Sequence, residues 1–178
     1  MKNLEIYIHI PFCVRKCEYC DFLSFPADDD AKLRYVKGLM AEMIFYGPLM
    51  KNYQVSSVYI GGGTPSSIDE QWIAALMEGV FDCFNVLPDA EISIECNPGT
   101  LSREKLLAYK DAGINRLSIG LQSANNDELK RLGRIHTFEQ FVTNYEVARN
   151  VGFKNINVDL MYGLPEQSAS QYLSLIHI

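Results

Sequence analysis

No stretch of this 178-residue sequence is apolar for long enough to cross a bilayer as a helix, a span that takes ~20 residues. Signal-peptide features are missing as well. The chain runs from Met1 straight into an alternating pattern, without the apolar segment and small-residue cleavage site of a leader. We therefore expect a cytoplasmic protein.

Positive charge is scarce. The sequence has 16 Lys and Arg against 22 Asp and Glu, a formal net charge of -6, and no run of basic residues interrupts this balance. A general nucleic-acid surface needs clustered basic side chains, so we predict no nucleic-acid partner.

The glycine run 61–63 is followed by Thr64-Pro65, so it has neither the Lys-Ser/Thr of a Walker loop nor G-x-G-x-x-G spacing.

Cysteine occurs only five times, yet three of these residues form one C-x3-C-x2-C motif at Cys13, Cys17 and Cys20. The motif follows a predicted strand at 4–10, and its loop-length spacing lets three thiolates surround one small metal cluster. A 4Fe-4S cube is usually held by four cysteines, so three leave one iron open to an external ligand. The motif therefore predicts a cluster with a reactive iron.

Two other uses of these cysteines remain open from the residues alone. A disulfide would leave the third thiol of the motif unpaired, in a chain whose cysteine count is odd. A structural zinc ion would need a fourth ligand, and the nearest candidate, His9, lies inside the predicted strand.

Short alternating strands, Gly-, Pro- or Ser-rich loops and amphipathic helices recur along the whole chain, which predicts an α/β fold of β/α units. We expect strands at 4–10, 55–60, 91–95, 116–122 and 155–160. We expect helices at 31–46, 70–84, 103–112, 126–132 and 138–151. The acidic run 28–30 is expected to cap the first helix, and Gly113 and Gly152 should end two others.

One face of most predicted strands is apolar and the other polar. In the first strand Ile6 and Ile8 alternate with Glu5, Tyr7 and His9, and the strands at 91–95, 116–122 and 155–160 repeat this split. A parallel sheet covered by helices on both faces would be apolar on both. The pattern predicts a barrel with helices outside, a polar lumen and an active face at the strand ends. Scattered polar residues within an ordinary core are the alternative.

The segment Tyr7-Ile-His-Ile-Pro-Phe-Cys13-x3-Cys17-x-Tyr19-Cys20 resembles the cluster loop of the radical S-adenosylmethionine (SAM) superfamily. More narrowly, it is similar to the HemN/HemW family of oxygen-independent coproporphyrinogen III dehydrogenases and haem chaperones. The resemblance covers residues 4 to 167. It implies a 4Fe-4S cluster on the three cysteines, SAM on the open iron, and a (β/α)6 TIM-like barrel.

The resemblance also implies which residues bind SAM, because the family's motifs recur here in the same order. The glycine loop matches the contact to the amino-acid end of SAM, and Asp159 matches a ribose-side carboxylate. Read without the resemblance, Glu95 would suit either a ribose or ammonium contact or a buried ion pair with an arginine, and Arg134 would suit the surface. The implied SAM-binding residues are Tyr7, Tyr19, Gly62, Gly63, Thr64, Glu95, Gln122, Arg134 and Asp159.

Two departures favour the haem-chaperone type within the family. The dehydrogenases carry a fourth cysteine where this chain has Phe22, and they have a longer segment ahead of the first strand. The resemblance then implies haem as cargo, delivery to haem-requiring proteins such as respiratory enzymes, and an electron donor such as flavodoxin or ferredoxin. Peripheral membrane association and dimer formation are compatible with that role. The alternative is a coproporphyrinogen III dehydrogenase of porphyrin biosynthesis.

Only five β/α units can be counted, whereas the superfamily barrel commonly has six. We therefore expect residues 1–178 to be an incomplete radical SAM core domain, cut off near Ser174, without its sixth unit and the family's C-terminal domain. The exposed barrel edge should make the chain prone to association. Cys83 and Cys96 are expected to be packed thiols, His136 to be structural, and Trp72 to lie in the core or an interface.

Overall fold

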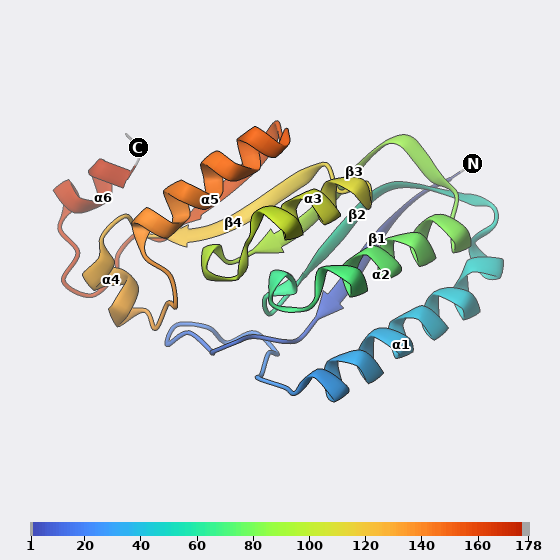
Figure 1. Ribbon diagram of the computed structural model, residues 1–178, viewed down its shortest axis with the longest axis horizontal. Coiled ribbons are helices and arrows are strands. Elements are labelled where there is room, and N and C mark those ends of the chain that lie inside the picture. The colour runs from blue at the N-terminus through green and yellow to red at the C-terminus, as the bar shows by residue number, and fades with distance from the viewer. Residues whose placement is uncertain (1, 176–178) are drawn as a thin grey trace.

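A computed structural model describes residues 2–175 and shows one sheet of five parallel strands. The strands lie in chain order, so each β/α unit places its strand beside the preceding one (Figure 1). They are β1 (Lys2–Ile10), β2 (Tyr53–Gly62), β3 (Val86–Cys96), β4 (Arg116–Gln122) and β5 (Asn155–Leu160).

Helices connect the strands and pack side by side along one face of the sheet, α1 against α2, α2 against α3 and α3 against α5 (Figure 1). This is the predicted partial TIM-like barrel, with its lumen on the other face of the sheet. The α-helices are α1 (Asp29–Tyr46), α2 (Glu70–Cys83), α3 (Arg103–Asp111), α4 (Asn126–Arg131), α5 (Phe138–Val151) and α6 (Ala169–Leu175); the 3-10 turns are η1 (Gly47–Met50), η2 (Pro65–Ser67) and η3 (Pro98–Thr100).

The apolar face of the strands forms the core, as the alternation predicted. Ile10, Ile60, Ile94, Leu117 and Ile119 are fully buried and belong to one hydrophobic cluster with the helices. Burial of a large aliphatic side chain contributes about 1.5–3 kcal/mol, which explains why the strand register is fixed by this face.

The polar residues of the strands line the lumen and bond to one another. Arg116 donates to the hydroxyl of Ser93 over 3.0 Å and lies 3.7 Å from Glu91. The neighbouring strands carry these groups at matched positions, Ser93 opposite Arg116. Hydrogen bonds therefore join the polar faces of neighbouring strands, as a polar lumen predicts.

Element boundaries differ from the predictions at a few places. Helix α1 begins at Asp29, two residues early, because Asp28 is its N-cap and accepts from the Ala31 N–H over 2.7 Å. Strand β3 begins at Val86 instead of Glu91, since Val86 pairs with Val55 ahead of a register shift in the β2 ladder. Pro88 in this stretch argues against a strand from sequence alone.

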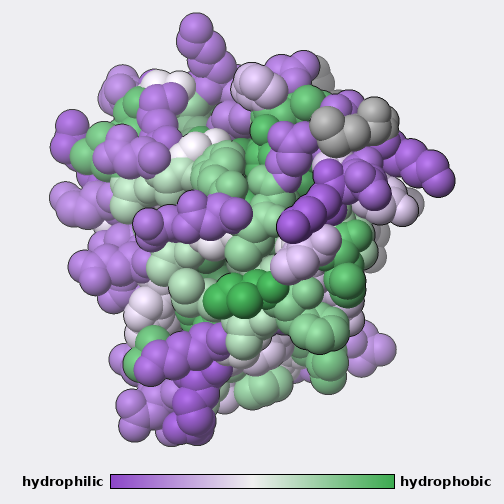
Figure 2. Space-filling model, turned by 90° about the vertical axis from the view of Figure 1, so that its right-hand side faces the viewer, coloured by the Kyte–Doolittle hydropathy of each residue, from purple (hydrophilic) through white to green (hydrophobic). Residues whose placement is uncertain are grey.

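None of the helices in residues 2–175 is both long and apolar enough to cross a membrane. Hydrophobic residues nevertheless gather in the middle of the face at the right of Figure 1 (Figure 2). The last turn of α1 and η1 expose Ile44, Phe45 and Leu49, each more than 60% accessible. We expected the domain to be cut off near Ser174, and residues 176–178 at that end lie outside the described residues.

All five strands point the same way, so their carboxyl ends meet at one rim of the sheet. Ile10 of β1 lies opposite Gly62 of β2, and Gly120 of β4 lies opposite Asp159 of β5. Side chains from distant parts of the sequence are thereby brought together at this rim.

Candidate metal and cofactor site

The cysteine motif lies in a loop at the rim that is held where a β-bridge closes it and again in its middle. Phe12 and Phe25 form a β-bridge that closes the loop, and their rings meet edge to face with centroids 5.8 Å apart. The Cys13 N–H donates to the Phe25 carbonyl over 3.1 Å. In the middle of the loop, the Glu18 N–H donates to the carbonyl of Leu132 over 3.0 Å.

The three cysteines of the motif line one cavity at the strand ends, together with residues from β2 to β5. The structure brings eleven of the twelve predicted site residues to this cavity; Tyr7 is the exception. The lining residues that the sequence predicted are Cys13, Cys17, Tyr19, Cys20, Gly62, Gly63, Thr64, Glu95, Gln122, Arg134 and Asp159.

Neither alternative use of the cysteines is supported by this geometry. All five cysteines are free thiols. His9 does not line the cavity; its Nδ1 is 3.0 Å from the Tyr7 hydroxyl and its Nε2 is 3.4 Å from the Leu23 carbonyl. Within residues 2–175, no three His, Cys, Asp or Glu side chains are placed to hold a single metal ion. A cluster is wider than one ion and needs its ligands further apart.

Cys96 also lines the cavity, which the sequence did not predict. It is 6% exposed, and its Sγ lies 3.7 Å from the carbonyl oxygen of Ile94. Burial and the nearby Glu95 carboxylate raise the pKa of the Cys96 thiol well above its usual range. Only a thiolate is a good metal ligand, so Cys96 behaves as the packed thiol that we expected. Cys83 is half-buried in α2.

Glu95 is held by two donors and forms no ion pair with an arginine. Its Oε1 accepts from the hydroxyl of Tyr59 over 2.9 Å, and its Oε2 accepts from the Gly62 N–H over 3.0 Å. Burial and this carboxylate raise the pKa of Tyr59 to about 12, so Tyr59 stays a donor. Tyr59 was missed by the sequence interpretation, although the alternation of β2 places it on the lumen face.

The backbone N–H groups of the glycine loop all bond within the protein. The Gly62 N–H bonds to Glu95, the Gly63 N–H to the Ile10 carbonyl over 2.8 Å, and the Thr64 N–H to the Phe12 carbonyl over 2.8 Å. These donors therefore hold the cysteine loop and the Glu95 side chain. A ligand beside Glu95 meets an acceptor there, which suits an ammonium group.

Two glycines of this loop meet requirements that no other residue satisfies. Gly62 has a φ of +121°, in the region that favours glycine. A Cβ on Gly63 would lie 2.7 Å from the Phe12 carbonyl oxygen and 3.0 Å from Cys13 Sγ. The glycine run thus allows β2 to approach the cysteine loop closely.

Gln122 and Arg134 come together from the end of β4 and the loop after α4. Gln122 has a φ of +69°, where a non-glycine residue is strained by about 1–2 kcal/mol, at an irregularity in the pairing with β5. Arg134 Nη2 donates to the Gly120 carbonyl over 2.6 Å, and its Nη1 lies 3.4 Å from the hydroxyl of Tyr19. Arg134 therefore faces the cavity and does not lie free on the surface.

Asp159 and Tyr19 also line the cavity. Asp159 accepts from the Asn157 amide over 2.7 Å and from the Ser118 hydroxyl over 3.3 Å, and it is otherwise exposed. Burial raises the pKa of Tyr19, and the adjacent Arg134 partly opposes this rise. Tyr19 is therefore a neutral phenol at neutral pH.

Tyr7 lies away from the cavity on the lumen side of β1. Its ring stacks on Tyr59 with centroids 6.2 Å apart, and its hydroxyl is 3.0 Å from His9 Nδ1. Tyr7 therefore adjoins Tyr59, which bonds to Glu95 of the cavity, and its contact with SAM stays a prediction.

Sequence reasoning missed a polar support beneath the cavity. Asn97 lines the cavity, and its Oδ1 accepts from the Gly99 N–H over 3.1 Å. That bond identifies Oδ1 as the amide oxygen, so His136 Nδ1, 3.1 Å away, must be the donor in its contact. Burial and the Arg134 charge lower the pKa of His136 to about 4. His136 is a neutral, 3% exposed structural residue.

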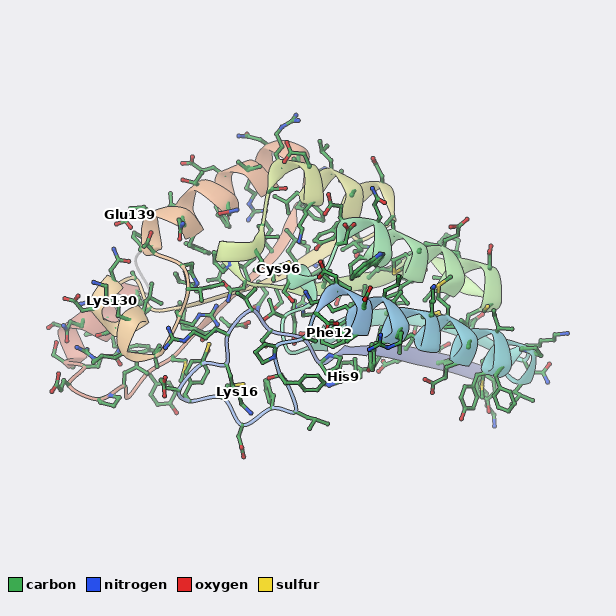
Figure 3. The ribbon with its side chains drawn as sticks, turned by 60° about the horizontal axis from the view of Figure 1, so that its bottom comes forward. His9, Phe12, Lys16, Cys96, Lys130 and Glu139 are labelled. Carbon is green, nitrogen blue, oxygen red and sulfur yellow. The ribbon has the colours of Figure 1, made fainter. Side chains whose placement is uncertain are left out.

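Two basic side chains, Arg15 and Lys16, also line the cavity and were not predicted. Figure 3 labels Lys16 in the loop beside the sheet, and its Nζ donates to the Phe22 carbonyl over 3.1 Å. Basic residues between metal-ligating cysteines would have been a usable signal, because they favour thiolates and anionic groups.

Comparison with known families identifies the class of protein. The model of the radical SAM superfamily matches residues 7–177. The chain therefore belongs to the radical SAM superfamily, and membership implies a 4Fe-4S cluster and SAM. The three free thiols and the polar groups around them fit this pair. When bound, the cluster and SAM supply one-electron radical chemistry.

The more particular resemblance is to haem chaperones. The haem chaperone HemW of Escherichia coli (strain K12) is 40% identical over 176 residues, which cover 96% of this chain and 45% of that protein. HemW of Bacillus subtilis (strain 168) is 40% identical over 91% of this chain and 43% of its own length. The chain thus spans less than half the length of these relatives.

Among solved structures, the coproporphyrinogen III oxidase HemN from Escherichia coli, a radical SAM enzyme, superposes with a TM-score of 0.91 at 32% identity. The match covers 99% of this chain and 41% of that chain. SuiB of Streptococcus suis bound to S-adenosylmethionine has a TM-score of 0.67 at 20% identity, covering 99% of this chain and 37% of its own, and shares the fold.

Proposed function

We propose that this chain is the cluster- and SAM-binding part of a HemW-type haem chaperone, which binds haem and delivers it to haem-requiring proteins such as respiratory enzymes. Binding of the cluster and SAM is supported by one observation, that Cys13, Cys17 and Cys20 line the same cavity. The 40% identity to HemW proteins supports the haem half.

The residues of the cavity divide into groups that suit different parts of SAM. Glu95 and the loop Gly62 to Thr64 offer acceptors for its ammonium group, and Arg134 and Gln122 offer donors for its carboxylate. Asp159 is an exposed carboxylate that can accept from ribose hydroxyls, and Tyr19 offers an aromatic face to the adenine. These side chains bind and orient the cofactor and keep water from the cavity.

The choice of a chaperone over a dehydrogenase rests on the cysteine loop. Phe22 occupies the place two residues after Cys20 where the dehydrogenases have a fourth cysteine, and it lines the cavity while 67% exposed. An apolar ring at this mouth suits a flat apolar ligand such as haem better than it suits a metal. The TM-score of 0.91 to the E. coli coproporphyrinogen III oxidase keeps the dehydrogenase as the second candidate.

Anaerobic reconstitution tests the cluster assignment. Replacing any one of Cys13, Cys17 or Cys20 by Ala should abolish bound iron and sulfide and the visible absorbance of the cluster. Cys83→Ala is the matched control that should retain both, because Cys83 is half-buried in α2 and does not line the cavity. Retention of the cluster after loss of Cys17 would contradict the assignment.

Two measurements separate the two candidates, and they use reconstituted protein of the full length that the HemW relatives have, because this chain spans less than half of that length. Haem titration followed by absorbance should give a saturable complex, and anaerobic incubation of coproporphyrinogen III with SAM and a reductant should give no protoporphyrinogen. Protoporphyrinogen formation would instead establish the dehydrogenase. Transfer of bound haem to an apo-respiratory enzyme then tests delivery.

A further inference from the structure

The sulfurs of two motif cysteines contact side chains from remote parts of the barrel. Cys13 Sγ lies 3.5 Å from the hydroxyl oxygen of Thr64, and Cys17 Sγ lies 3.7 Å from Arg134 Nη1. We propose that Thr64 and Arg134 raise the reduction potential of the cluster by donating hydrogen bonds to these two thiolates. This inference rests on the proposed cluster assignment and adds a role beyond SAM binding.

The chemistry of the partners fixes the direction of both bonds. A cysteine bound to a cluster is a thiolate and has no proton to give, so the Thr64 hydroxyl must donate to Cys13. Arg134 has only donors and is always charged, so its bond to Cys17 is charge-assisted.

Both donors are held in place before any cofactor binds. The backbone N–H of Thr64 bonds to the carbonyl of Phe12, the residue next to Cys13. Arg134 is held by its 2.6 Å bond from Nη2 to the Gly120 carbonyl. Such prior fixation reduces the freedom that these two residues lose when the cluster forms.

The charge of Arg134 is directed largely at the cysteine loop. Among the salt bridges of residues 2–175 none involves Arg134, and its Nε is buried with no hydrogen-bond partner. Its nearest polar contacts on the loop are Cys17 Sγ and the Tyr19 hydroxyl. Before SAM binds, no carboxylate neutralises this positive charge, so it acts more strongly on the neighbouring thiolate.

Reduction adds one negative charge to the cluster. Donors to its sulfurs stabilise the reduced form more than the oxidised form, because the sulfurs become more electron-rich on reduction. Removing a donor should therefore make the potential more negative. The effect of Arg134 should exceed that of Thr64, since Arg134 contributes a whole positive charge as well as a hydrogen bond.

The test is an EPR-monitored redox titration of the reconstituted chain without SAM, after iron and sulfide contents have been matched. We expect Thr64→Val, which keeps the shape of the side chain, to lower the reduction equilibrium constant about tenfold, a shift of ~59 mV to more negative potential for one electron. Thr64→Ser keeps the hydroxyl and should restore the wild-type value. Arg134→Gln should shift the potential further in the same direction.

Arg15→Gln is the matched control for charge. Arg15 lines the same cavity, but it is a 61% exposed side chain that lies 3.8 Å from Glu18 and has no contact with a sulfur. Its loss should shift the potential much less than the loss of Arg134, because solvent screens an exposed charge. Arg134→Lys, which keeps the charge, should fall between wild type and Arg134→Gln.

The outcomes separate this proposal from the function on which it rests. Full cluster content with unchanged potentials in Thr64→Val and Arg134→Gln would overturn the tuning role alone. Equal shifts in Thr64→Val and Thr64→Ser would overturn the role of the Thr64 hydroxyl. A wild-type chain that assembles no cluster would overturn the proposed function itself.

Discussion

His136 shows how one buried side chain couples folding to pH. Its ring is 3% exposed, and burial together with the nearby Arg134 charge disfavours the protonated form in the folded chain. The folded-state pKa is lowered to about 4, whereas the unfolded chain has the ordinary value of 6.5. Between these values the unfolded state binds more protons, so stability falls as pH falls.

We predict that wild type loses about 2 kcal/mol of unfolding free energy through His136 between pH 7 and pH 5. His136→Gln keeps a donor for Asn97 and removes the titration, so it should lose correspondingly less over this interval. Urea unfolding of both proteins at the two pH values measures the difference. Parallel losses in the two proteins would show that His136 does not carry the effect.

Gly63 provides a second prediction at the scale of one residue. In Gly63→Ala the new Cβ would meet the Phe12 carbonyl oxygen at 2.7 Å and Cys13 Sγ at 3.0 Å, so the cysteine loop must move. We expect a loss of about 1–3 kcal/mol in unfolding free energy and reduced iron content after reconstitution. Normal iron content and stability would contradict the close approach of β2 to this loop.

At the scale of elements, α1 offers a stabilising change that also serves as the control for Gly63. Gly38 lies on the exposed face of α1, and a Cβ there would have no atom within 4 Å. Gly38→Ala should raise the free energy of unfolding by about 0.5–1 kcal/mol, because alanine costs less backbone entropy in a helix. Chemical denaturation checks the value, and cluster content should not change.

Strand alternation and capping residues made most elements predictable. β4, α5 and β5 have the predicted bounds, and Gly152 ends α5 with a φ of +103° as expected of a C-cap glycine. The sequence patterns that predict these three elements are local, since each depends on residues within one element. Where a boundary depends on pairing with a neighbour, as at Val86 of β3, sequence reasoning was wrong.

The sequence predicted which residues line the site, but it did not predict the hydrogen bonds between them. The motifs indicated the residues, but the bonds from Tyr59 and Gly62 to Glu95 join positions more than 30 residues apart. The strained φ of Gln122 has no local signature, because glutamine rarely adopts a positive φ. Neither feature follows from periodicity or spacing.

At the scale of the whole molecule, the sheet has two unpaired edges. Within residues 2–175, β1 pairs only with β2 and β5 only with β4. Exposed strand edges pair with other chains unless charge or irregular structure prevents it. The exposed Ile44, Phe45 and Leu49 at the end of α1 add apolar surface.

We therefore predict concentration-dependent self-association, measurable as a rising weight-average mass in sedimentation velocity. Asn155→Lys places a positive charge on the exposed start of β5 and should weaken association several-fold, because two such edges repel each other. Asn150→Lys is the same exchange at an exposed position of α5 and should leave association unchanged. Equal effects of the two variants would show that the β5 edge is not the contact.

The parallel order of the strands also sets when the site can exist during synthesis. Cys17 and Arg134 touch across 117 positions of sequence, and Thr64 reaches Cys13 across 51. The ribosome therefore delivers the thiols first and their hydrogen-bond donors much later, and such long-range closure is the slow part of folding. A nascent chain carries three unprotected thiols until β4 and the loop after α4 have emerged. We therefore expect the cluster to be inserted only after these segments have been synthesised.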